Sequence, residues 1–228
     1  MASFESEAAK RIDILEKTTR KLQARNVPDF YMGYTNMPVL PTYASATSVT
    51  IAGIDLTASL TIGVKCAWYQ SAGWRYGYVL SSSYGSGNTT LNFVSNTSYS
   101  VANTAISTFK ISYGNPPDFP YWLNFTPAVV PLSGAFTTVS AAGRFSVSGR
   151  IVAYENDITI TTNGTAVGVQ SYIPIATGGN YYVLYGIVGT SMVSAFGTGT
   201  SYLVYRYDGA TNINGDGVSI HLRGNYKI

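Results

Sequence analysis

The single histidine, His221, is the first residue to consider for catalysis. Apolar Val218, Ile220 and Leu222 alternate with their neighbours, which predicts a final β-strand with His221 on its polar face. A Ser-His-Asp triad would have to use this imidazole, but the chain has no Gly-x-Ser-x-Gly sequence for a nucleophile elbow. We therefore interpret His221 as a surface or subunit-interface residue.

Two carboxylates lie close in sequence, Glu155 and Asp157. On a strand they would share a face, and a glycoside hydrolase needs two carboxyl groups about 5–9 Å apart. Asn156 between them favours a turn. We therefore interpret the pair as solvated edge charges and keep glycoside hydrolysis as the alternative.

Metal and phosphate sites have weak support. Residues 212–217 resemble the start of a calcium loop, but the twelfth position holds Arg223 instead of an acid. The glycines around Ser86 and Thr198 lack the context of a phosphate-binding loop. Cys66 is the only cysteine, which excludes a disulfide or a cysteine-based zinc site within one chain. We expect no catalytic centre, no metal and no cofactor.

Aromatic residues give a stronger indication of function, because the chain has 19 tyrosines and 3 tryptophans. Such side chains supply stiff amphipathic area to recognition surfaces. By alternation, the sequence predicts that Trp68, Trp74, Tyr76 and Tyr78 face a common core. The candidate receptor or interface aromatics are Tyr172, Tyr181, Tyr202, Tyr205 and Tyr207.

The N-terminal segment differs in kind from the rest, with ten charged residues among its first 25. An a/d seam predicts a helix that packs against copies of itself, or alternatively against its own β domain. Pro28 ends this helix, and a proline-containing connector reaches residue 42. The seam consists of Ala8, Ile12, Leu15, Thr19 and Leu22.

From about residue 43 the hydrophobic period becomes two, which predicts a mainly β protein. A small barrel or sandwich is expected over 43–114, with a strand over 60–68, a hairpin turn at 70–73 and a loop over 81–88. Prolines mark a linker over 115–131. Residues 132–228 predict a C-terminal β-sandwich, jelly roll favoured, in which Tyr181, Val183, Tyr185 and Ile187 alternate along one strand.

Composition narrows the function further. Charged residues make up 11% of the chain and the net charge is only +3, which does not indicate nucleic-acid binding. Aromatic residues at 14% argue against disorder. The chain has no apolar run long enough for a membrane span and no apolar segment near its first residue, so we expect synthesis in a cytosol and no membrane insertion.

The β region resembles virion fibre proteins of tailed bacteriophages. The resemblance rests on the strings at 46–57, 60–65 and 74–79, which look like a small β module of such fibres, and on 134–137, 143–150 and 173–175, which look like their tip domains. It covers about 43–228 by pattern, and it implies a homotrimer anchored to the virion by its N-terminal part. It carries no catalytic residues.

The leading hypothesis is a tail-fibre or receptor-binding subunit in the virion, made in the cytoplasm of a bacterial host. Residues 1–42 would dock to other virion proteins, and the C-terminal domain would bind a host-surface glycan or protein. The alternatives are a capsid head fibre or decoration protein, a polysaccharide-degrading tail spike using Glu155 and Asp157, and a non-viral lectin-like module.

Overall fold

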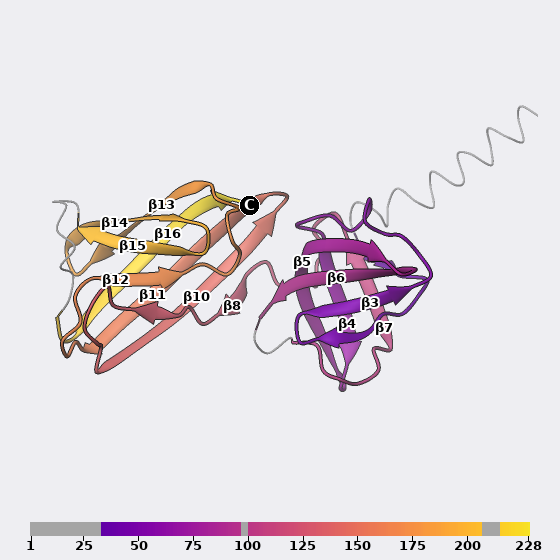
Figure 1. Ribbon diagram of the computed structural model, residues 1–228, viewed down its shortest axis with the longest axis horizontal. Helices are drawn as coiled ribbons and strands as arrows, with labels where there is room; N and C mark the ends of the chain where they lie inside the picture. Colours follow the sequence, from indigo (N-terminus) through magenta and orange to yellow (C-terminus); the bar gives the residue numbers. More distant parts are fainter. Residues whose placement is uncertain (1–32, 97–99, 207–214) are drawn as a thin grey trace, which may run out of the picture.

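The computed structural model describes residues 33–96, 100–206 and 215–228, which form two antiparallel β-sheets in neighbouring lobes (Figure 1). The predicted mainly β class is confirmed. The expected helix, with its seam Ala8, Ile12, Leu15, Thr19 and Leu22, lies outside the described residues, as does Tyr207. Within the described ranges, no helix is long and apolar enough to cross a membrane.

The first sheet has seven strands in the order β1-β7-β4-β5-β6-β3-β2. Its chain begins before residue 43, because β1 pairs with β7. The strands are β1 (Thr35–Asn36), β2 (Thr42–Ser45), β3 (Ser48–Ala52), β4 (Lys65–Gln70), β5 (Gly73–Gly85), β6 (Asn88–Ser95) and β7 (Thr108–Ser112).

Two local predictions in this sheet are wrong. The segment expected to be a strand from residue 60 is a series of turns up to Val64, with a backbone hydrogen bond from Val64 N to Thr61 O of 3.2 Å. The segment 81–88 is not a loop, because β5 and β6 pair through it down to a two-residue turn. Ser86 and Gly87 form that turn at φ 52° and 77°, the left-handed conformation that joins tightly paired strands.

The first sheet is buried on both faces, which separates aromatic residues that the sequence placed together. Trp68 is fully buried in the core inside this sheet, where its ring centroid lies 4.9 Å from that of Phe93. Tyr78 points to the opposite face and is buried against the second lobe. Trp74 is 39% exposed, so the predicted common core of these tryptophans and tyrosines is wrong.

The second sheet has nine strands in the order β8-β10-β11-β16-β13-β14-β15-β12-β9, curled around one core. It is one continuous hydrogen-bonded sheet. Two of its strands, β8 and β9, lie within the predicted linker 115–131. The strands are β8 (Leu123–Phe125), β9 (Val129–Val130), β10 (Thr138–Ser148), β11 (Ile151–Thr162), β12 (Val169–Tyr172), β13 (Tyr181–Val188), β14 (Ser191–Thr198), β15 (Ser201–Arg206) and β16 (Val218–Lys227).

The two lobes meet through aromatic packing. Phe119 contacts Tyr78 of β5 at a ring-centroid distance of 5.0 Å, and Tyr78 lies 6.3 Å from Phe145 of β10. Backbone also approaches backbone here: a Cβ on Gly63 would stand 2.4 Å from the carbonyl oxygen of Gly149. The junction is thus a packed interface, and the segment between the sheets is part of it.

Candidate functional site

The candidate functional site is the solvent-facing side of the second sheet, here called the outer face. It carries the side chains of β10, β11 and β13 to β16 that point away from the core. The register places Tyr185 opposite Arg223 and Ile187 opposite His221. The outer face therefore has an apolar half on β13, β14 and β15 and a charged half on β16, β11 and β10.

The charged half is a set of ion pairs between neighbouring strands. Glu155 accepts a hydrogen bond from Arg144 Nε, and its other oxygen lies 3.6 Å from Arg223 Nε. Asp157 Oδ1 lies 2.7 Å from His221 Nδ1. The side chains of these last two residues are 66% and 51% exposed, so water screens their attraction.

The turn predicted at Asn156 is wrong, because β11 runs without interruption from Ile151 to Thr162. Strand geometry puts Glu155 and Asp157 on the outer face, as the sequence predicts for a strand, and turns Asn156 into the core. There its amide nitrogen donates to the Tyr202 hydroxyl at 2.5 Å. Each of the two carboxylates is therefore engaged by a cation from an adjacent strand.

His221 lies on the polar face of the last strand, as predicted, with Ile220 and Leu222 buried. Its contact with Asp157 reproduces two members of a triad. In the part of the chain that the structure describes, no hydroxyl hydrogen bonds to the imidazole, so this pair has no nucleophile beside it. The geometry is that of a cross-strand polar pair.

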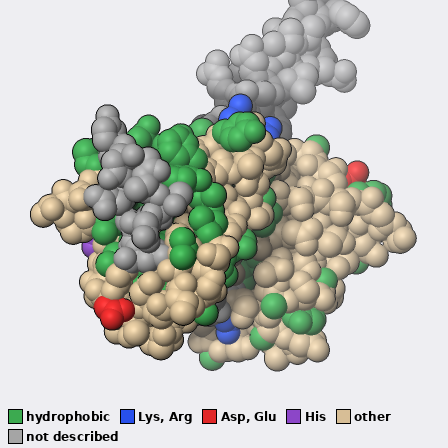
Figure 2. Space-filling model, turned by 60° about the vertical axis from the view of Figure 1, so that its left-hand side comes forward, with side chains coloured by type: hydrophobic (Ala, Val, Ile, Leu, Met, Phe, Trp, Pro, Cys, Tyr) green, Lys and Arg blue, Asp and Glu red, His purple; other side chains and the backbone are tan. Residues whose placement is uncertain are grey.

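The apolar half exposes large side chains side by side, and Figure 2 shows hydrophobic side chains gathered on the lobe of the second sheet. Contiguous apolar area of this kind on a soluble protein marks an interaction site. The most exposed members are Tyr181 at 88%, Tyr185 at 63%, Met192 at 62%, Phe196 at 52% and Ile187 at 49%.

A groove of about 420 Å³ lies at one end of the apolar half. Tyr181 and Phe196 line it together with Leu132, while Thr198 and Ser201 supply hydroxyl groups. None of the described lining residues is charged. Aromatic rings with a few neutral hydrogen-bonding groups form the kind of site that holds an uncharged sugar, whose ring stacks on the aromatics and whose hydroxyls bond to the polar groups.

The structure separates the predicted receptor aromatics. Tyr181 lines the groove, and Tyr205 packs on Phe196 with ring centroids 6.0 Å apart, so both lie on the outer face. Tyr172 is half-buried on β12, where its carbonyl accepts a hydrogen bond from Tyr154.

Tyr202 does not belong to the outer face, although it reaches the floor of the groove. It is 1% exposed, and its hydroxyl lies 3.0 Å from that of Tyr154 in the core. Burial raises the pKa of Tyr202 above its ordinary range. The interpretation of Tyr202 as a receptor or subunit-interface residue is therefore corrected to a core residue.

Sequence reasoning did not single out Tyr185, Ile187, Met192 and Phe196 as surface residues. It placed the alternating set of β13, Tyr181 to Ile187, as the buried one, whereas Tyr182 and Leu184 face the core. A shift of one residue exchanges the two faces of a strand. The missed signal is that β13 is apolar on both faces, which indicates that both are meant to be covered.

Comparison with known proteins gives no relative: no family model, no curated protein and no solved structure matches the chain.

Proposed function

We propose that the chain is a virion attachment subunit of a tailed bacteriophage, a tail-fibre or receptor-binding protein, and that the groove on the outer face binds a host-surface glycan. The single observation that carries the glycan-binding part is the groove between Tyr181 and Phe196, with its neutral hydroxyl groups. The bacteriophage part rests on the resemblance of residues 43–228.

The apolar half beyond the groove supports a second role, the contact between subunits. Ile187 and Met192 pair across β13 and β14 at the far end from Tyr181, and both are about half exposed or more. Aliphatic side chains covered by a copy of the same chain would bury this area in a homotrimer. The trimer would be completed by the seam from Ala8 to Leu22, and residues 1–42 would dock to other virion proteins.

The proposed role is binding without catalysis. Glu155 and Asp157 each have a cationic partner, Arg144 and His221 respectively. A glycoside hydrolase would have to free these side chains before they could flank a sugar. The proposal also retains the sandwich tip as a jelly-roll-like unit, with the curled sheet as its support.

The test is binding of the full-length protein to an array of bacterial surface glycans and to intact host cells. Removing the Tyr181 ring by Tyr181→Ala should weaken glycan binding about tenfold or more, since an aromatic anchor is a typical hot spot. Tyr84→Ala is the matched control, because Tyr84 is a 48% exposed tyrosine on the first sheet. Equal binding by the two variants would remove the groove from the proposal.

A further inference from the structure

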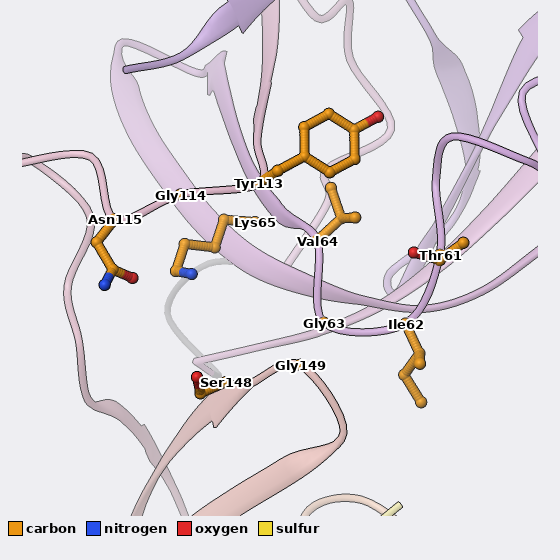
Figure 3. A pocket seen from close by; sticks show the side chains of 10 residues that line it. All are labelled: Thr61, Ile62, Gly63, Val64, Lys65, Tyr113, Gly114, Asn115, Ser148 and Gly149. Carbon is orange, nitrogen blue, oxygen red and sulfur yellow. The ribbon is translucent and has the colours of Figure 1, made fainter. Parts of the chain in front are cut away.

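A second cavity, distinct from the groove, lies between the two lobes (Figure 3). The turn 61–64 of the first lobe forms one wall, residues 113–115 form another, and the β10–β11 turn at Ser148 and Gly149 closes the third side. Its volume is about 300 Å³. This is at the lower end of the range for small-molecule sites and suits a ligand the size of one sugar.

Lys65 supplies the only charge among the described residues that line this cavity. It is the first residue of β4 and is 6% exposed. Its ammonium nitrogen lies 5.8 Å from the ring centroid of Tyr78 and 5.9 Å from that of Phe119. Those rings stabilise a cation, but they leave its hydrogen-bond donors unused.

The Lys65 ammonium has no anionic partner in the described part of the chain. No carboxylate there lies within 4.0 Å, and burial alone lowers the pKa of the lysine. An ammonium group withdrawn from water is costly unless it is paired and hydrogen-bonded. A lysine held in this way at the wall of a cavity is prepared for an anion that enters from outside.

Neutral polar groups complete the site. Figure 3 shows the Lys65 side chain extending from its strand toward the segment that carries Asn115 and the turn that carries Ser148. Thr61 adds a third polar side chain, and Ile62 and Val64 supply apolar surface. Amide and hydroxyl groups both donate and accept, so they match a ligand that carries hydroxyl groups.

We propose that the cavity between the lobes binds a small sugar acid, a monosaccharide whose single carboxylate pairs with Lys65 and whose hydroxyls bond to Asn115, Ser148 and Thr61. One ammonium suits a monoanion. A phosphate or sulfate dianion is usually held by several donors or by a bidentate arginine, and no arginine lies among the described lining residues. The inference concerns a different site from the groove and does not depend on it.

The experiment is a titration of the full-length protein with sodium glucuronate, followed by NMR of the lysine side-chain CH₂ groups next to the ammonium. A saturable shift of the Lys65 signal is expected, with no such shift for glucose, which lacks the carboxylate. Lys65→Met and Lys65→Gln should each weaken binding about tenfold or more, since a charge-assisted hydrogen bond is lost.

Lys110→Met is the matched control, because Lys110 lies on the adjacent strand β7 over another aromatic ring, 4.6 Å from the Trp74 centroid. Glucuronate binding should survive this change and also Tyr181→Ala, which separates the cavity from the groove. An unchanged Lys65 signal in the unmodified protein overturns the proposal, and that result needs no variant to fold. An equal response to acetate overturns the sugar-acid assignment.

Discussion

At the scale of single residues, the core of the second lobe is built from tyrosines that bond to one another. The Tyr154 hydroxyl contacts that of Tyr202 at 3.0 Å, and Tyr202 also accepts from Asn156. Tyr182 and Tyr226 pack beside them, with ring centroids 5.3 Å apart. This explains part of the high tyrosine content, because many of these rings act as core residues with a polar end that needs a partner.

Burial raises the pKa of Tyr154, Tyr182, Tyr202 and Tyr226 above the ordinary value of about 10, and that of Cys66 above about 9. Below these ordinary values both states keep the protons, and the free energy of unfolding does not change through these groups. At higher pH the unfolded chain releases protons that the folded chain retains. The free energy of unfolding should therefore be constant up to about pH 9 and then fall.

The measurement is urea unfolding at several pH values, together with tyrosinate absorbance of the folded and unfolded protein at pH 11. Lys65 acts in the opposite direction, because burial lowers its pKa, but it is one group against five. Fewer tyrosines should ionise in the folded protein than in urea. Full ionisation of every tyrosine in a protein that remains folded would contradict the burial of this cluster.

At the scale of elements, hydrophobic alternation predicted β16 and the β4–β5 hairpin, because each carries one clear face or turn. It could not predict which face of β13 is inward, since both sets of side chains are apolar. Packing decides that point: Gly186 faces the core side of the sheet, where a Cβ would stand 1.8 Å from the His221 carbonyl oxygen.

The segment 81–88 shows a different limit of sequence reasoning. Its serines and glycines are typical of loops, yet it forms the end of a hairpin. A bulge between Val79 and Ser81 bends β5, and the polar residues beyond it form an exposed ribbon that needs no apolar alternation. Long-range pairing with β6 decides the structure here, and no local pattern records it.

At the scale of the whole molecule, the groove was beyond prediction because it brings together residues from Leu132 to Leu203. The division near the proline-rich segment has a counterpart in the two sheets, but both ends of that division take part in packing. Tyr34 packs on the core of the second lobe, while Met37 and Val39 pack on the core of the first. A chain beginning at residue 43 would lose these contacts, so residue 33 is the sounder starting point for truncation.

The junction between the lobes can be tested at Gly63. Its φ of +87° and its approach to Gly149 leave no room for a side chain, so Gly63→Ala should push the lobes apart. We expect a loss of about 1–3 kcal/mol in the free energy of unfolding. Gly53→Ala is the control, because Gly53 has a φ of +77° but nothing within 4 Å of the added Cβ.

Urea unfolding of both variants gives the comparison, and small-angle X-ray scattering reports whether the lobes separate. Gly63→Ala should cost more stability than Gly53→Ala and should increase the radius of gyration. Equal stability losses would mean that only backbone strain matters, and that the contact with Gly149 does not hold the lobes together.

The oligomeric state is the decisive property of the whole molecule for an attachment subunit. Light scattering of the full-length chain should give the mass of a trimer, because the helical seam and the apolar outer face would both be covered by neighbouring copies. A chain beginning at Gly33 keeps the packing of Tyr34, Met37 and Val39 but loses the seam. Its trimer should therefore dissociate on dilution, and Met192→Lys in this shorter chain should leave a monomer at every concentration. A monomeric full-length chain would contradict the proposed self-association and would leave residues 1–42 as a docking segment alone.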